Sequence, residues 1–266
     1  MIGVLAGDII GSVFERHSTK DTDFPLFSPH SRFTDDTVLT VATAYAILKG
    51  VPYATAYHDF GRRYPNAGYG GAFIEWLRSS TPLPYNSWGN GSAMRVAPVG
   101  LAFDTAERVL SEAERSAVGT HDHPEGVKGA QATALAVFMG RSGAQKEEIR
   151  AEIVGRFGYD LSRRIDDIRP TYQWNVSCQG SVPEAIIAFL DSESVEHAIR
   201  LAVSLGGDSD TQAAIAGGIA QAHYGHVPAE ITEQVCARLP AEFIDVIDAF
   251  TRALPDRLRS DGHQLR

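Results

Sequence analysis

Apolar residues recur at helical spacing along most of this 266-residue chain. After Asp36, apolar positions from Val38 to Ala46 fall three or four residues apart, and Gly50 follows as a stop signal. A second long segment begins near Pro124, a residue favoured in the first helical turn, and is rich in small side chains. These patterns predict long helices that pack closely in the interior.

Further helix starts are indicated by capping residues. Asp104 with Glu107, and Ser181 with Glu184, have the spacing of a capping box. Ser194 precedes an apolar helical stretch that runs to the glycines at 206–207. Only residues 171–178 alternate in the manner of a strand, and an extended loop is the alternative there. The fold class expected is all-α, a compact multi-helix bundle.

The chain contains no low-complexity tract and no Pro/Gly/Ser linker, so residues 1–266 are expected to form a single domain. Long loops are expected at 7–33, 66–73, 85–95 and 120–126, and they carry many Gly, Trp, Asn and His residues. Long ordered loops in a compact domain are more often functional than not. A ligand site is therefore expected among them.

Composition narrows the possible partners. With 24 Lys and Arg against 33 Asp and Glu, the net charge is −9, which argues against general binding to a nucleic-acid backbone. A small anion held through a metal stays possible. Cys178 and Cys236 lack CxxC spacing, which excludes a thiolate metal site or disulfide framework and leaves two thiols or one long-range bridge. No targeting or membrane segment is visible, so a cytoplasmic protein is expected.

Two clusters of oxygen ligands, each at a predicted helix start, indicate where the chemistry lies. They comprise Thr34, Asp35 and Asp36, and Asp208, Asp210 and Thr211. A helix cap uses one side chain, sometimes two, so three acceptors at each of two helices exceed what capping needs. Carboxylates brought together raise one another's pKa unless a cation neutralises them. If the two helix starts converge, these ligands suit two Mg²⁺ or Mn²⁺ ions.

Six segments together resemble one known family. They are GDIIGSVFE, FTDDT, GYGG, SWGNGSAMR, THDHPEG and GGDSDT, in this order between residues 7 and 211. The chain is thereby similar to the ADP-ribosylglycohydrolases, which include the dinitrogenase-reductase-activating glycohydrolase and the ADP-ribosyl-acceptor hydrolases. The resemblance implies an all-α hydrolase that cleaves the glycosidic bond between ADP-ribose and an acceptor. It also implies two divalent ions held by the six residues of the acidic clusters.

The resemblance further implies roles around the distal ribose. In the family the ions hold the ribose diol and a water beside the anomeric carbon, where oxocarbenium character develops. Asp35 is the candidate for taking the proton of that water. Glu15 matches a glutamate on a mobile loop over the site, as general acid/base or gate, and an orienting or surface role is the alternative. Asp8 is expected to brace the N-terminal turn between two glycines.

Two loops are expected to bind the ADP part. Gly68, Gly70 and Gly71 precede a helix, where free N–H groups bind phosphate, although a tight turn would also explain them. The family uses this segment near the diphosphate and distal ribose. Trp88 matches an aromatic residue that stacks on adenine, an interaction worth about 1–3 kcal/mol, and the alternative is a side chain that plugs its own loop.

The remaining candidates flank these loops. Ser87 and Asn90 are expected to hydrogen-bond the ligand or the loop backbone. His121 matches a family histidine close to the diphosphate, and His123 has no assigned role. These two histidines do not share a helix face, which argues against zinc. Acceptor choice is assigned to the loop from about 16 to 32, which has apolar tips that include Phe24.

Two other readings stay open at this point. An all-α HD-type phosphohydrolase would use the pairs His58–Asp59 and His121–Asp122 as metal ligands. A non-catalytic member of the resembling family would bind ADP-ribose without turning it over. The acceptor and the oligomeric state are not given by the residues.

Overall fold

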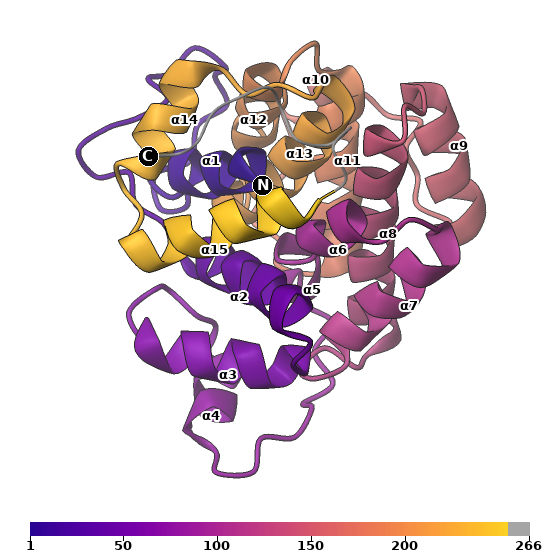
Figure 1. The fold of residues 1–266 in the computed structure, drawn as a ribbon. Coiled ribbons are helices and arrows are strands. Elements are labelled where there is room, and N and C mark those ends of the chain that lie inside the picture. Colours follow the sequence, from indigo (N-terminus) through magenta and orange to yellow (C-terminus); the bar gives the residue numbers. More distant parts are fainter. Residues whose placement is uncertain (255–266) are drawn as a thin grey trace.

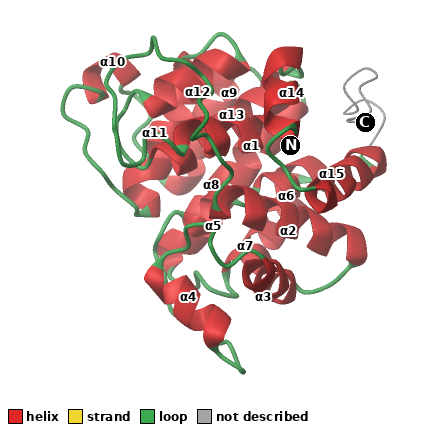
Figure 2. Cartoon of the chain, turned by 90° about the vertical axis from the view of Figure 1, so that its left-hand side faces the viewer, coloured by secondary structure: helices red, strands yellow, loops and turns green. Residues whose placement is uncertain are grey.

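Helices form the regular structure throughout residues 1–254, the part of the chain that the computed structural model describes (Figure 1). This confirms the predicted all-α class, and the cartoon in Figure 2 shows helices and loops alone. Within that part, the one extended pairing is a bridge between Gly89 and Ser177. The helices are α1 (Ile2–Gly11), α2 (Asp35–Lys49), α3 (Tyr53–Arg63), α4 (Gly71–Arg78), α5 (Gly91–Met94), α6 (Ala97–Ala102), α7 (Ala106–Ala117), α8 (Pro124–Arg141), α9 (Lys146–Phe157), α10 (Ile165–Ile168), α11 (Cys178–Asp191), α12 (Val195–Val203), α13 (Ser209–Tyr224), α14 (Ala229–Cys236) and α15 (Ala241–Ala253).

The two helices at the centre, α1 and α13, touch backbone to backbone (Figure 1). Gly3, Gly7 and Gly11 lie four residues apart on one face of α1. A Cβ on Gly7 would lie 2.1 Å from the carbonyl oxygen of Ala213, and a Cβ on Gly11 would lie 2.5 Å from the Cα of Asp210. Side chains at these positions would force the helices apart, so glycine sets the approach of α1 to the start of α13.

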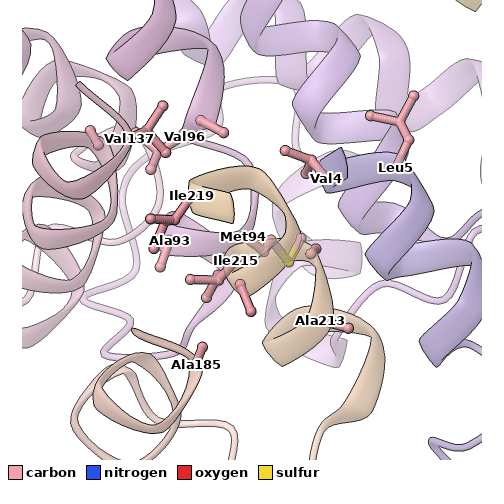
Figure 3. Close-up of a cluster of buried hydrophobic side chains, with 14 of the residues drawn as sticks. Val4, Leu5, Ala93, Met94, Val96, Val137, Ala185, Ala213, Ile215 and Ile219 are labelled. Carbon is pink, nitrogen blue, oxygen red and sulfur yellow. The ribbon is translucent and has the colours of Figure 1, made fainter. Parts of the chain in front are cut away.

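One continuous hydrophobic core surrounds this pair. Figure 3 shows Ile215 of α13 beside Met94 of α5, with Val4 and Leu5 of α1 as further members of the cluster. The small residues of α8 let it pack closely in the interior, as the sequence predicts, and the structure shows that it packs against α13. Burial of these apolar surfaces stabilises the arrangement by roughly 25 cal/mol per Å² removed from water.

Several predicted helix boundaries are confirmed. Gly50 ends α2 in the left-handed conformation at φ 64°, which glycine adopts without steric cost. Ser194 caps α12 by accepting from the backbone N–H of His197 at 3.1 Å. Pro124 occupies the first turn of α8. Residues 171–177 form a loop with a single bridge at Ser177 rather than a strand, and Cys178 begins α11.

Both predicted capping boxes are wrong. The helix expected from Ser181 begins three residues earlier, because Ser177 is the N-cap and accepts from Gly180 N at 3.0 Å. The helix expected from Asp104 is capped by Thr105, which accepts from Arg108 N at 3.2 Å. In both cases a neighbouring hydroxyl in extended backbone satisfies the free N–H groups.

The loop expected over 7–33 begins late, because residues up to Gly11 belong to α1, whose side chains are buried from Ile2 onward. The remaining loop is tied down at two points. The Lys20 ammonium donates to the carbonyls of Tyr172 and Leu205 at 2.7 and 2.5 Å. The Arg200 guanidinium donates to the carbonyls of Thr22 and Phe24 at 2.9 and 2.8 Å.

Phe24, expected at an apolar lid tip, is instead buried against the ring of Phe14, with centroids 4.6 Å apart. Cys178 and Cys236 are free thiols, which answers the question of a long-range bridge. Within residues 1–254, no helix combines the length and the apolar character that a bilayer crossing requires.

Candidate functional site

The start of α2 is held by a carboxylate from another helix. Asp8 of α1 accepts from the backbone N–H groups of Thr34 and Thr37 at 2.9 and 3.0 Å, and from the Thr34 hydroxyl at 2.6 Å. Asp8 therefore does for α2 what a cap residue does, and it complements the helix dipole. The expectation that Asp8 braces the N-terminal turn is wrong, because the residue lies inside α1 and stabilises α2.

The starts of α2 and α13 meet at this point, which is the condition for a shared cation site. The Thr211 hydroxyl donates to Asp36 Oδ2 at 3.4 Å, and carboxylate oxygens of Asp8, Asp36 and Asp210 lie within 4.8 Å of one another. Asp208 joins the same group through a hydrogen bond with Asp210. All six predicted ligands thus gather in one place, together with Asp8.

Burial and mutual repulsion hold protons on this cluster when no cation is present. Loss of water, followed by the charge of Asp8, raises the pKa of Asp35 to about 8. The pKa values of Asp36 and Asp210 lie well above the ordinary aspartate value for the same two reasons, burial first and neighbouring carboxylates second. Negative charge concentrated in this way is neutralised either by protons or by a cation.

The donor set fits divalent cations. Asp36 Oδ1 is buried and has no hydrogen-bond partner, so it keeps lone pairs free for a ligand. The neighbouring ligands are carboxylate and hydroxyl oxygens, which suit Mg²⁺ or Mn²⁺. A buried, unpaired carboxylate oxygen is otherwise costly, which argues for a binding role.

Asn90 connects the acidic cluster to the loop before α5. Its side-chain amide donates to Asp208 Oδ2 at 2.7 Å and to Ser181 Oγ at 3.2 Å, and the residue is buried. The Asn90 side chain therefore acts on the cluster and on α11, and these two bonds are neither to a ligand nor to the loop backbone, the two roles expected for it. The amide also fixes the orientation of one oxygen of Asp208.

The glycine segment before α4 lies against the cluster. The backbone N–H of Asp35 donates to the carbonyl of Ala67 at 3.0 Å, and a Cβ on Gly68 would lie 3.4 Å from Asp35 Oδ1. Gly68 has φ 112°, a conformation that side chains rarely adopt. Gly70 is the N-cap of α4 and Gly71 its first residue, and both are exposed with open space around them. The N–H groups of this helix start are therefore available to an anion.

The side chain of Trp88 projects from its loop into solvent. It is 48% exposed, so it does not plug the loop. Its backbone is fixed because Trp88 O accepts from Cys178 N at 3.0 Å, and Ser87 Oγ accepts from Gly89 N at 3.1 Å. A rigid loop that presents an exposed indole is suited to stacking on a planar ring.

His121 lies beneath the same loop and is buried. Cβ atoms added to Gly91 and Gly89 would lie 3.1 and 3.6 Å from His121 Nε2, so these glycines leave room for the imidazole. Its Nδ1 is 2.8 Å from the Thr120 hydroxyl. Burial, and secondly the charge of Arg95, lower the pKa of His121 well below its usual value. His123 instead caps α8, accepting from Glu125 N at 3.1 Å.

Glu15 follows α1 and is partly exposed. Burial is the main cause of the raised pKa values of Asp35 and Asp208, and the charge of Glu15 adds to both, as expected of a carboxylate near the site. Glu15 also lines a surface cavity of about 320 Å³ with His17 and Arg32. That position is compatible with a group at the rim of the site.

The His-Asp pairs of a phosphohydrolase are placed otherwise. His58 packs edge-on against Trp76, and Asp59 pairs with Arg63 on the surface of α3. Asp122 accepts from the backbone N–H of Asn86 at 2.7 Å. Across residues 1–254, Asp8, Asp36 and Asp210 form the cluster with metal-ligand spacing, and neither His-Asp pair contributes to it.

The structure is an all-α protein with a buried carboxylate cluster between two helix starts that could hold a metal ion, and comparison with known proteins gives the family. The model of the ADP-ribosylglycohydrolase family matches residues 1–263. The chain therefore belongs to the ADP-ribosylglycohydrolase family and is a hydrolase of that type.

Named relatives and a solved structure agree with this assignment. The chain is 29% identical to human ADP-ribosylhydrolase ARH3, with 89% of this chain and 87% of that protein covered. It is 27% identical to ADP-ribosylarginine hydrolase Tri1 of Pseudomonas putida strain GB-1, covering 88% and 72%. A solved "ADP-ribosylglycohydrolase-related protein complex" superposes with a TM-score of 0.73 at 27% identity, covering 94% and 95%.

Sequence reasoning missed the role of Asp8. A single aspartate in an apolar segment gives little signal, but its position in a run of glycines four residues apart indicates a helix that packs closely on another. Tyr69 was also missed. Its buried hydroxyl has no hydrogen-bond partner, and burial, followed by the charge of Asp35, raises its pKa, so it lies near the cluster.

Proposed function

We propose that this protein hydrolyses the glycosidic bond between ADP-ribose and an acceptor with the help of two divalent cations, Mg²⁺ or Mn²⁺. The observation that carries the proposal is the convergence of two helix starts whose buried carboxylates have raised pKa values and one unpaired oxygen. The proposed ligands are Thr34, Asp35, Asp36, Asp208, Asp210 and Thr211.

Bound cations would supply a site for the diol of the distal ribose and would lower the pKa of a nearby water. The protein's own groups prepare this site. Asp8 fixes Thr34 and the start of α2, while Asn90 orients Asp208. These contacts keep the ligand oxygens in place before substrate arrives, which reduces reorganisation during the reaction.

Asp35 is the proposed proton acceptor for the attacking water. It is the less buried of the two adjacent aspartates, so it is the more accessible to water. Glu15 is proposed to serve the leaving group or to close the site, because it stands at the rim and acts electrostatically on Asp35. Glycosidic cleavage uses such a division between one carboxylate for water and one for the acceptor.

Binding of ADP would use the two loops. The N–H groups at Gly68, Gly70 and Gly71 would bind the diphosphate, and His121, which lies below Gly89 and Gly91, would also contact it. Trp88 would stack on adenine, with Ser87 holding the loop in shape.

A cytoplasmic location stays a prediction.

The test uses purified protein, Mg²⁺ or Mn²⁺, and substrates in which ADP-ribose is linked to arginine, serine or a nucleobase. Release of free ADP-ribose from at least one of them is expected, and no release from any would overturn the proposal. Calorimetry with ADP-ribose distinguishes the remaining alternative. Tight binding without turnover would identify a non-catalytic member of the family.

A further inference from the structure

Among residues 1–254, Arg95 is the largest side chain that is completely buried, and no carboxylate of that part of the chain forms an ion pair with it. The guanidinium lies on the ring of Tyr57, 4.0 Å from its centroid. Nη2 donates to the carbonyl of Ser116 at 3.2 Å and to the Thr120 hydroxyl at 2.8 Å. Nε and Nη1 are buried and have no hydrogen-bond partner. A buried cation held in this way costs stability, so its presence calls for a role beyond packing.

The hydroxyl of Thr120 joins Arg95 to His121. A guanidinium can only donate, so Thr120 Oγ1 is the acceptor of that bond. Oγ1 also lies 2.8 Å from His121 Nδ1 and 3.5 Å from the carbonyl oxygen of Ala117. Its own proton has to go to one of these two neighbours.

The carbonyl of Ala117 is already occupied. It accepts from the backbone N–H groups of Thr120 and His121 at 3.0 and 2.8 Å, which uses both of its lone pairs. A hydroxyl that accepts from a cation is also polarised toward donating its proton. The proton of Thr120 therefore goes to His121 Nδ1, so Nδ1 is the unprotonated nitrogen of the ring.

The second ring nitrogen must then carry the hydrogen. Nε2 lies under the backbone of Gly89 and Gly91, where an added Cβ would come within 3.6 and 3.1 Å of it. Within residues 1–254, no protein acceptor for Nε2 is found. Burial and the nearby charge of Arg95 lower the pKa of this imidazole, which keeps the ring neutral.

We propose that Arg95 and Thr120 are positioning residues that hold His121 as the Nε2–H tautomer and aim this donor at a phosphate oxygen of the ligand beside Gly89 and Gly91. The phosphate part of the inference rests on the proposed function, while the tautomer does not. Neither Arg95 nor Thr120 touches the ligand; both act through His121.

The tautomer is measured directly by long-range ¹H–¹⁵N correlation NMR of the histidine rings in the ligand-free, ¹⁵N-labelled chain. The His121 signals are assigned by their loss in His121→Gln. We expect Nδ1 to be unprotonated and Nε2 protonated in the natural protein and in Thr120→Ser, which keeps the hydroxyl. A His121 ring protonated at Nδ1 would overturn the proposal, and this readout needs no variant at Thr120 to fold.

The affinity for ADP-ribose tests whether the tautomer of His121 matters for binding. Thr120→Val should allow Nδ1–H to form and should weaken ADP-ribose binding by about tenfold in calorimetry, with Thr120→Ser close to the natural protein. Thr133→Val is the matched control, because Thr133 is equally buried and its hydroxyl has no partner. A Thr120→Val protein that keeps the Nε2–H tautomer and the natural affinity would contradict the proposal.

The two proposals fail in different ways. An Nε2–H ring in a protein that neither binds nor hydrolyses ADP-ribose conjugates would support the role of Arg95 and Thr120 and refute the proposed function. A His121 ring protonated at Nδ1 in a protein that hydrolyses these conjugates would refute the role of Arg95 and Thr120 and support the proposed function.

Discussion

Asp36 concentrates the chemistry of the site in one residue. Its Oδ2 is within hydrogen-bonding distance of the hydroxyls of Thr34 and Thr211, and its Oδ1 has no partner. In the absence of a cation this arrangement is unfavourable, as the strongly raised pKa shows. Stability and function therefore make opposite demands on Asp36.

The Asp36→Asn variant should show the effects of Asp36 on stability and on hydrolysis separately. Replacing a carboxyl group that the metal-free fold can bury only at the cost of protonating it should leave the melting temperature of the metal-free protein unchanged or higher. Hydrolysis should fall by about 100-fold or more, since losing even an outer-shell partner of a metal typically costs about 10–100-fold. Thermal melts with and without Mg²⁺, alongside rate measurements, check both statements. His58→Ala, outside the cluster, should keep the response to metal; loss of that response in His58→Ala alone would favour the phosphohydrolase alternative.

Trp88→Ala should weaken ADP-ribose binding by about 10–100-fold, the loss of a stacking interaction worth about 1–3 kcal/mol. Trp88→Tyr should retain most of the affinity because it keeps an aromatic face. Trp174→Ala is the control, since Trp174 is 50% exposed and lines a different surface cavity. Equal affinities of Trp88→Ala and the natural protein in calorimetry would rule out adenine stacking at this residue.

At the scale of helices, the approach of α1 to α13 decides where Asp8 lies. Gly7 faces the backbone of Ala213, and Gly11 faces that of Asp210. The same close approach brings Asp8 within reach of Asp36 and Asp210. The glycines that allow α1 to approach α13 therefore also determine where Asp8 lies in the site.

Gly7→Ala tests that link. Although alanine favours a helix, its Cβ would lie 2.1 Å from the carbonyl of Ala213, so α1 must move and the free energy of unfolding should fall by about 1–3 kcal/mol or more. The melting-temperature increase on adding Mg²⁺ should shrink as Asp8 shifts. Gly155→Ala, in α9 with open space around it, should instead stabilise by about 0.5–1 kcal/mol. Equal stability of the two variants in denaturant titrations would contradict the argument.

The elements that sequence predicted well are those with strong local signals. Gly50, Pro124 and Ser194 mark helix boundaries through backbone conformation and capping, which depend on neighbouring residues alone. The errors at Ser181 and Asp104 arose where two capping side chains compete, at Ser177 and Thr105. Tertiary contacts decide which of two neighbouring capping residues begins the helix, and a local sequence pattern does not show these contacts.

At the scale of the whole molecule, the residues of the acidic cluster were identified because adjacent carboxylates repel, whatever the fold. Asp8 was not, since its role depends on a helix 200 residues later in the chain approaching α1. The relay from Arg95 to His121 was likewise invisible, because it joins residues through a buried hydroxyl. Local charge patterns were predictable, and contacts created by packing were not.

The stability of the metal-free protein should fall as pH rises from about 4 to about 8. The folded chain holds protons on Asp35, whose pKa is about 8, and on Asp36 and Asp210, which the unfolded chain releases near their ordinary values of 3.8. The folded state then binds more protons than the unfolded state, so the slope of unfolding free energy against pH is negative. His121 acts in the opposite direction below its ordinary pKa of 6.5, because its folded-state pKa is lowered.

Bound metal should reverse the fall of stability with rising pH that the carboxylates cause, because cations replace the protons on these groups. The stabilisation by Mg²⁺ should therefore grow with pH. Melting temperatures across this pH range, in chelator and in Mg²⁺, provide the measurement. Asp36→Asn should show a shallower slope in chelator. A metal-free melting temperature that rises steadily from pH 5 to pH 8 would contradict the assignment of raised pKa values to the cluster.

The most direct test of the central claim is the rate of ADP-ribose release from an ADP-ribosylated substrate by chelator-treated protein as Mg²⁺ or Mn²⁺ is added back. The acidic cluster at the starts of α2 and α13 predicts negligible release in chelator and a saturable return of activity with metal. Release that continues undiminished in chelator would show that hydrolysis does not depend on cations at Asp35, Asp36, Asp208 and Asp210.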